Sequence, residues 1–175
     1  MGPEDASPSP GQAPAAAGEA SGARIEHAPD EQAMTALGER LGRACSGGAI
    51  IYLTGDLGTG KTTLVRGVLR GLGHRGPVRS PTFTLVEPYA VGPVPVYHLD
   101  LYRLGDPEEL EYLGLRDYLE PGVVWLVEWP ERGVGHLPRP DLRVTIEYRG
   151  TGRRLELTAE TATGRRLLDQ ISMQA

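Results

Sequence analysis

Residues 49–73 read AIIYLTGDLGTGKTTLVRGVLRGLG. The first five of them are apolar and include two β-branched isoleucines, which predicts a buried strand over 49–53. From Leu64 to Leu72 the apolar residues recur at helical spacing until Gly73, which predicts a helix. Between them, residues 55–62 match the phosphate-loop pattern G-x-x-x-x-G-K-[ST] at every position. A strand, such a loop and a helix in this order indicate a P-loop nucleotide-binding domain.

The loop carries the residue types that a phosphate site needs. Its glycines let backbone N–H groups turn toward phosphate oxygens, and the helix that follows adds the positive end of its dipole. We expect Lys61 to reach the terminal phosphates and the Thr62 hydroxyl to bind Mg²⁺, which prefers hard oxygen ligands. The predicted nucleotide-binding residues of the loop are Asp56, Leu57, Gly58, Thr59, Gly60, Lys61, Thr62 and Thr63.

Two features of the composition, a single lysine and no asparagine, bear on which nucleotide the loop binds. Lys61 is the single lysine of the 175 residues, and the chain has no asparagine. A lysine kept in an arginine-rich chain supports a specific role, because a guanidinium does not replace a compact ammonium. Guanine-specific P-loop proteins generally read their base through an Asn/Thr-Lys-x-Asp motif, which needs a second lysine. The sequence therefore predicts ATP rather than GTP.

Acidic residues follow two further predicted strands. Asp100 comes directly after the strand predicted over 94–99, and Glu128 after the strand predicted over 123–127. Parallel strands place their carboxyl ends at one edge of the sheet, where the phosphate loop also lies. We expect Thr62, Asp100 and Glu128 to hold Mg²⁺, and Lys61, Asp100 and Glu128 to carry the catalysis. Glu128 could instead orient the attacking water as a general base, and a solvent-facing strand end is the structural alternative for each acid.

Four other residues are weaker candidates, each with a structural alternative. His98 is interpreted as a hydrogen-bonded packing residue rather than a ligand or base. Thr82 follows Pro81 in a loop that is typical either of a switch sensing the γ-phosphate or of a plain turn. Arg103 could reach the γ-phosphate or a partner, or form a surface salt bridge. Trp129 could serve an interface, although core packing is its usual role.

The remaining pattern predicts one α/β domain. Residues 1–23 are rich in Pro, Ala, Gly and Ser, which predicts a disordered tail, and residues 24–175 are expected to form a single P-loop ATPase domain. Further strands are expected at 24–27 and 84–89 and as a hairpin of 141–148 with 153–158, and further helices at 30–45, from 106 and from 164. The predicted fold is a P-loop NTPase-like three-layer domain with a largely parallel central sheet and an antiparallel addition.

Composition and charge argue against several other classes of protein. The net charge of −5 disfavours a nucleic-acid-binding surface, so the arginine pairs at 153–154 and 165–166 are interpreted as solvated. The single cysteine, Cys45, permits neither an internal disulfide nor a cysteine metal cluster. The chain has no apolar stretch of bilayer length, and its N-terminus lacks the pattern of a secretory signal. We expect a cytoplasmic protein with no membrane association.

Several motifs, taken in order, resemble one known family. GDLGTGKTT begins at residue 55, SPTFTLVEPY at 80, VYHLDLYRL at 96, DPEELEYLG at 106 and LVEWPERG at 126. Their combination is similar to bacterial TsaE, also called YjeE, over about residues 25–160. The resemblance implies a small ATPase of tRNA threonylcarbamoyladenosine biosynthesis that hydrolyses ATP slowly with Mg²⁺. It also implies association with a TsaB–TsaD pair, with tRNA reached indirectly through that complex.

The resemblance also assigns roles to residues of this chain. It implies that Lys61 is the phosphate-loop lysine, that Thr62 binds magnesium, and that Asp100 and Glu128 are the acids of the magnesium site. Thr82 corresponds to the threonine of the family's SPT loop and is counted among the nucleotide-binding residues.

Two features depart from the family. Met34 stands where the family often has a threonine near the nucleotide base, and the N-terminal tail is longer than usual. How the base is held and what the tail does therefore stay open.

Two other function classes compete with an ATPase subunit. A small-molecule P-loop kinase would need an arginine-rich lid, and the candidate lid at 132–139 is short and rich in Gly and Pro. A nucleotide-gated binding module would use ATP occupancy alone to drive docking. Because no residue is an assured arginine finger, we expect slow hydrolysis that a partner accelerates.

Overall fold

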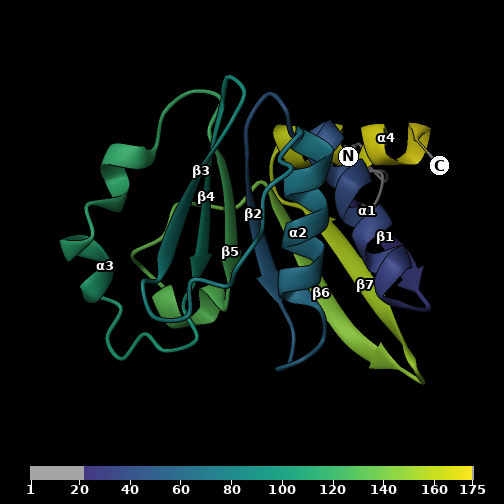
Figure 1. Ribbon diagram of the computed structural model, residues 1–175, viewed down its shortest axis with the longest axis horizontal. Helices are drawn as coiled ribbons and strands as arrows, with labels where there is room; N and C mark the ends of the chain where they lie inside the picture. The colour runs from purple at the N-terminus through teal and green to yellow at the C-terminus, as the bar shows by residue number, and fades with distance from the viewer. Residues whose placement is uncertain (1–21, 175) are drawn as a thin grey trace, which may run out of the picture.

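The computed structural model describes residues 22–174, and its centre is a seven-stranded sheet of order β1-β7-β6-β2-β5-β4-β3 (Figure 1). The strands are β1 (Ala23–Ala28), β2 (Ala49–Thr54), β3 (Val86–Val91), β4 (Val94–Asp100), β5 (Val124–Glu128), β6 (Leu142–Arg149) and β7 (Gly152–Ala159). The central strands β6, β2, β5 and β4 run parallel, whereas β7, β1 and β3 each pair antiparallel with their neighbours. The predicted largely parallel sheet with an antiparallel addition is confirmed.

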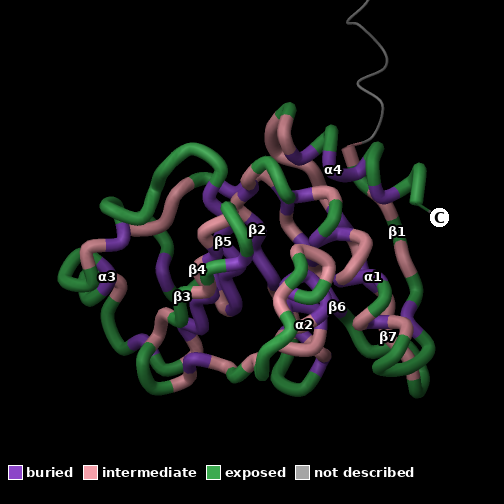
Figure 2. The backbone as a smooth tube through the Cα atoms, turned by 45° about the horizontal axis from the view of Figure 1, so that its top comes forward, coloured by how far each residue is buried: buried purple, intermediate pink, exposed green. Residues whose placement is uncertain are grey.

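Helices lie on both faces of this sheet. The helices α1 (Glu31–Ala44), α2 (Lys61–Leu72) and α4 (Ala162–Met173) pack on one face, over a core that includes Leu41, Ile51 and Leu64. The other face is covered by residues 101–123, which contain only α3 (Glu109–Tyr112) and the 3-10 turn η1 (Leu115–Tyr118), over a core around Trp125. The third layer is therefore thin. Figure 2 shows the central strands as the most buried part of the chain.

Local signals explain where the main helices begin and end. Asp30 caps α1 as predicted, because its Oδ1 accepts a hydrogen bond from Ala33 N at 2.8 Å. Gly73, with φ 111°, ends α2 as predicted. At the predicted start of α3, Asp106 Oδ1 accepts from Glu108 N at 2.9 Å, but the helix proper is a single turn.

The helices α1 and α2 are in backbone contact, side by side in Figure 1. A Cβ atom added to Gly38 would lie 2.5 Å from Leu64 O, and one added to Gly67 would lie 2.4 Å from Thr35 O. Such distances leave no room for a side chain on either residue. The contact repeats one helical turn later at Gly42 and Gly71. It holds α1 directly against the helix that follows the phosphate loop.

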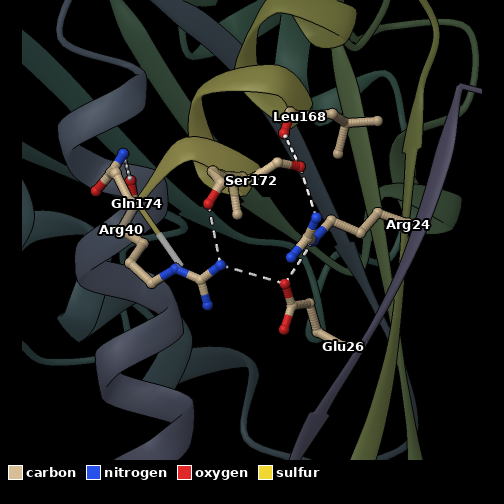
Figure 3. Close-up of polar contacts among 7 residues, drawn as sticks. Arg24, Glu26, Arg40, Leu168, Ser172 and Gln174 are labelled. Carbon is tan, nitrogen blue, oxygen red and sulfur yellow. Dashed lines mark hydrogen bonds and ion pairs between the residues drawn. The ribbon is translucent and has the colours of Figure 1, made fainter.

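A polar network fastens α4 to β1 and α1 (Figure 3). Glu26 Oε1 accepts from Arg24 Nε at 2.6 Å and from Arg40 Nη2 at 3.3 Å. Arg40 Nη2 also donates to Ile171 O at 3.1 Å, and Arg24 Nη1 donates to Ser172 Oγ. This carboxylate is therefore paired with two guanidinium groups. We call Glu26, Arg24 and Arg40 the arginine network.

Two further expectations concern the N-terminal tail and membrane association. The predicted disordered tail falls mainly on residues 1–21, which lie outside the described residues, whereas Ala23 already pairs with Thr158 in the sheet. Among the helices within residues 22–174, none combines the length and the apolarity needed to cross a membrane.

Candidate functional site

The phosphate loop joins β2 to α2 at the carboxyl edge of the parallel strands. Gly55, Gly58 and Gly60 have φ values of 152°, 80° and 107°, a region of backbone conformation that favours glycine. A Cβ atom on Gly55 would also lie 2.6 Å from Ile146 O. The buried Thr59 donates its hydroxyl proton to Asp56 O at 2.9 Å. These glycines and this hydrogen bond fix the wrapped path of the loop.

Lys61 is buried at the first position of α2. Its Nζ donates to Gly55 O at 2.6 Å and to Asp56 O at 2.9 Å, and it lies 4.3 Å from the centre of the Trp129 ring. Burial lowers the pKa of this ammonium below its usual value, and the carboxylate of Glu128 acts in the opposite direction. The side chain thus holds a hydrogen-bond donor at the centre of the loop, where phosphate oxygens would meet it.

Asp100 and Glu128 end β4 and β5 side by side, because the two residues are partners in the parallel ladder. Thr62 Oγ1 donates to Glu128, at 3.0 Å from Oε1 and 3.3 Å from Oε2. Asp100 accepts from Ser80 Oγ through Oδ2 and from Tyr102 N at 3.1 Å through Oδ1. The predicted metal-binding residues therefore lie together at one sheet edge.

Both acids are buried, with exposures of 6% for Asp100 and 2% for Glu128. Neither forms an ion pair with a lysine or an arginine within residues 22–174, where His98 is the one basic side chain that contacts Glu128. Two buried carboxylates without a paired cation are costly unless another cation neutralises them. Their oxygens and the Thr62 hydroxyl are hard ligands of the kind that Mg²⁺ prefers, so the donor set fits this ion.

One cavity of about 480 Å³ contains all of these groups. Its lining residues are Leu57, Gly58, Gly60, Lys61, Thr62, Thr63, Ser80, Thr82, Asp100, Tyr102, Arg103, Glu128 and Trp129. Every residue predicted to bind metal or to carry catalysis is among them, as is Thr82. We call it the phosphate cavity.

A second cavity of about 250 Å³ adjoins the first across the phosphate loop. It is lined by Gly58, Thr59, Gly60 and Thr63 of the loop segment, by Ala28, Asp30, Glu31 and Met34 at the start of α1, and by Thr151, Gly152 and Arg153 of the β6–β7 hairpin. Met34, which departs from the family pattern, lies directly against the loop, since its Cε is 3.3 Å from the Cβ position of Gly60. Of the predicted loop residues, only Asp56 lines neither cavity.

Comparisons with known proteins identify the family of this chain. The family model for "Threonylcarbamoyl adenosine biosynthesis protein TsaE" matches residues 28–155. The chain belongs to the TsaE family. A TsaE protein of Haemophilus influenzae is 45% identical over 152 residues, covering 84% of this chain and 96% of the relative. One of Bacillus subtilis is 44% identical over 119 residues, covering 68% of this chain and 73% of the relative.

A solved structure supports the predicted fold. The crystal structure of YdiB from Bacillus subtilis matches with a TM-score of 0.74 and 29% identity, covering 87% of this chain and 95% of that one. The match spans most of both chains, so the predicted α/β fold is confirmed along with the family.

In this TsaE chain Arg103 and Thr82, two of the weaker site candidates, have the following neighbours. The Arg103 guanidinium lies 4.6 Å from the ring centre of the exposed Phe83, and no ion pair joins it to an acid within residues 22–174. Thr82 Oγ1 donates to Ser80 Oγ at 3.4 Å, which links the SPT loop to Asp100. The contact of either residue with a nucleotide stays a prediction.

Trp129 has an unusual backbone for an aromatic residue. Its φ is 57°, in the left-handed region that non-glycine residues rarely adopt. This turn directs the half-buried ring toward Lys61 and places it 5.0 Å from the ring of Tyr102. Strained residues of this kind concentrate at functional sites. The ring therefore forms a wall of the phosphate cavity, in addition to packing against its neighbours.

Sequence reasoning missed the contact between the β6–β7 hairpin and the phosphate loop. Tyr148 Oη donates to Leu57 O at 2.9 Å, and Arg153 Nε donates to Thr59 O at 3.0 Å. The Arg153 guanidinium also lies 4.4 Å from the centre of the Tyr148 ring. Arg153 was interpreted as solvated, but it holds a loop carbonyl across 94 residues of sequence. No local pattern signals such a contact.

The interpretation of His98 as a packing residue is also incomplete. His98 is fully buried, and its Nε2 lies 2.7 Å from Glu128 Oε2. Its other ring nitrogen, Nδ1, is buried without a hydrogen-bond partner among the described residues. A buried polar atom left without a partner costs about 1–3 kcal/mol. The histidine thus contacts the site through a carboxylate, at a cost that an apolar residue would avoid.

Proposed function

We propose that this TsaE-family protein binds and hydrolyses Mg-ATP and acts with a TsaB–TsaD pair in the threonylcarbamoyladenosine modification of tRNA. The supporting observation is the convergence of Lys61, Thr62, Asp100 and Glu128 on one cavity beside the phosphate loop. The two acids there lack a paired lysine or arginine among the described residues, which fits a site that takes up a divalent cation.

Different groups of the chain bind the phosphates, hold the metal ion and orient the attacking water. Backbone N–H groups of the loop and the Lys61 ammonium bind and orient the phosphates, and Thr62, Asp100 and Glu128 hold the ion. When bound, Mg²⁺ neutralises the charge that develops on the transferred phosphoryl group. An acid oxygen that is not ligating the ion can accept a hydrogen bond from the attacking water and orient it. The Trp129 ring covers one side of the Lys61 ammonium, 4.3 Å from Nζ.

Slow hydrolysis by the isolated chain is expected. Arg103 is the single arginine lining the phosphate cavity within the described residues, and its guanidinium stacks on Phe83. An arginine placed on the transferred phosphate is worth about 10³–10⁵ in rate where it has been measured. A partner that supplies or repositions such a group would raise the turnover. The exposed Phe83, in the loop that contacts Asp100 through Ser80, gives the site a route to a docked partner.

A small-molecule kinase function has less support than the ATPase function. In the candidate lid, Arg139 donates to Glu160 O, on the side of β6 and β7. Arg132 lies over the rings of Tyr102 and Trp129, at 5.3 and 5.8 Å from their centres. Arg132 alone, packed against the cavity wall, does not make the arginine-rich lid that a kinase would close over its acceptor.

The test measures phosphate release by the pure chain, alone and with a purified TsaB–TsaD complex, beside a tRNA modification assay. Slow release that rises with the complex, together with modification that depends on this chain, is expected. Lys61→Ala is the matched control and should abolish both effects. If the complex neither binds the chain nor changes its turnover, and modification proceeds equally without it, the proposed role is wrong. A labelled small acceptor instead of free phosphate would favour a kinase.

A further inference from the structure

His98 lies inside the protein beneath the two acids of the phosphate cavity. It is in β4, two residues before Asp100, so their side chains share the face of the sheet that α2 covers. In the parallel ladder, His98 pairs with Leu126, and Asp100 pairs with Glu128. The histidine is therefore one step deeper in the sheet than the acids. It is fully buried and does not line the cavity.

This position excludes direct contact with a ligand and leaves one polar neighbour. A fully buried residue that does not line the cavity is not exposed to an ion or a phosphate bound there. Within the described residues, the single hydrogen bond of the ring joins His98 Nε2 to Glu128 Oε2 at 2.7 Å. An ionised carboxylate only accepts hydrogen bonds, so Nε2 carries the proton and donates it.

The Glu128 carboxylate is consequently fixed from two sides. Thr62 Oγ1 holds it at the cavity, and His98 Nε2 holds it from the interior. A glutamate side chain has three rotatable bonds, and a single hydrogen bond from Thr62 would leave the carboxylate free to rotate. The hydrogen bond from His98 to Oε2 restricts that rotation. Groups that hold a metal-binding carboxylate in this way commonly affect metal affinity or activity by about 10–100-fold.

Packing alone does not explain a histidine at this place. An apolar side chain would fill the space without leaving a polar atom unpaired, whereas His98 leaves Nδ1 without a partner among the described residues. The neighbours Val96 and Leu126 on the same face belong to the apolar core. The hydrogen bond to Glu128 is therefore what the polar ring adds at this place.

We propose that His98 is a positioning residue, whose Nε2–H orients the Glu128 carboxylate for magnesium binding and phosphoryl transfer. The proposal rests on the proposed ATPase function for its catalytic consequence. Its structural content, an imidazole that donates from Nε2 to Glu128, does not depend on that function.

Three substitutions separate positioning from packing. In His98→Gln the side-chain amide nitrogen can reach the place of Nε2, whereas in His98→Asn it reaches only the place of Nδ1, and His98→Leu has no donor. We expect kcat to fall about 10–100-fold in the Asn and Leu variants and to stay near the wild-type value in the Gln variant. The affinity for ATP without Mg²⁺ should change little, and the Mg²⁺ concentration for half-maximal activity should rise in parallel with the loss of kcat. Thermal unfolding identifies any variant that fails to fold.

A spectroscopic measurement on the wild-type chain tests the contact without hydrolysis. The chain has four histidines, and His27, His74 and His136 are exposed or half-buried. In ¹⁵N-histidine NMR we expect one slowly exchanging imidazole N–H, in the Nε2–H tautomer, which shifts or exchanges faster in Glu128→Ala.

The outcomes are distinct. An Nδ1–H tautomer, a full kcat in His98→Leu, or a well-folded His98→Gln as inactive as His98→Leu would overturn the positioning role. A wild-type chain that does not hydrolyse ATP would overturn the proposed function instead. The NMR experiment and the effect of Mg²⁺ on nucleotide binding in the His98 variants would still decide the inference.

Discussion

Two ends of the molecule hold a carboxylate in a polar cluster, and they balance its charge differently. In the arginine network at the α4 end, Glu26 is paired with two guanidinium groups, from Arg24 and Arg40 (Figure 3). At the phosphate-loop end, Glu128 is held by a threonine hydroxyl and a histidine ring, and within residues 22–174 no lysine or arginine pairs with it. In the first cluster the carboxylate is neutralised by its arginines, whereas in the second the negative charge is left for a cation.

The contrast teaches how to tell a structural cluster from a binding site. Ion pairs that satisfy each other fasten elements together, as the arginine network fastens α4. Buried acids that no lysine or arginine pairs with, beside a cavity, cost stability and are typical of a ligand-binding site. Substitutions at the two ends should therefore have opposite effects on stability and on function.

The largest effect is expected from Lys61→Ala. The ammonium is the single buried cation of the phosphate cavity within the described residues, and its loss removes a charge-assisted contact with phosphate. The affinity for Mg-ATP should fall by roughly 2–5 kcal/mol, while the unfolding temperature changes little. Calorimetric titration with ATP measures the first quantity, and thermal unfolding measures the second. Wild-type affinity in the folded variant would show that the nucleotide does not bind at this loop.

Glu128→Gln and Asp100→Asn test the unpaired charge directly. Each should lower kcat by about 10²–10³-fold, because electrostatic stabilisation of the transition state is lost, and each should weaken ATP binding much less. Removing a buried negative charge should leave the ligand-free chain at least as stable as the wild type. Single-turnover hydrolysis at saturating Mg²⁺ and denaturant unfolding report the two effects. A clear loss of stability in either variant would mean that the acids are structural, like Glu26.

Much of this site was predictable because its signals are local. The strand, the glycine pattern and the helix occur within 25 consecutive residues, from 49 to 73. Asp30 caps its helix through a hydrogen bond to a residue three positions away. Asp100 and Glu128 each follow an apolar strand, and the rule that parallel strands end at one edge then brings them together.

The missed features depend on contacts between distant parts of the chain. The hydrogen bond of His98 to Glu128 requires the register of β4 against β5 across 30 residues. Arg153 reaches the phosphate loop only because the hairpin pairs beside β2 through β6. The contact of α1 with α2 at Gly38 and Gly67 depends on how closely the two helices approach each other, which the sequence of one helix does not specify. Such features follow from packing, which one sequence does not specify locally.

Glu26→Gln is the matched substitution at the α4 end. It leaves the guanidinium groups of Arg24 and Arg40 without their shared carboxylate, and these side chains are 29% and 20% exposed. Because solvent partly screens such charges, the free energy of unfolding should fall by only about 1–2 kcal/mol. ATP affinity and kcat should equal those of the wild type. Urea unfolding and the phosphate-release assay check these two statements, and an altered kcat would show that the two ends are coupled.

The smallest effect is expected from Tyr148→Phe, which removes one hydroxyl from the contact between the hairpin and the phosphate loop. The Leu57 carbonyl that accepts its hydrogen bond is in an exposed residue, so water can replace the lost donor, and stability should change by less than about 1 kcal/mol. The loop should nevertheless be less rigid before ATP binds, and the ordering then required should lower ATP affinity by about threefold or less. Arg153→Ala removes a second hold, on Thr59 O, and should weaken binding further. Calorimetry on both variants gives the comparison. Equal affinities in Tyr148→Phe, Arg153→Ala and the wild type would mean that the loop glycines and Lys61 organise the phosphate site without the hairpin.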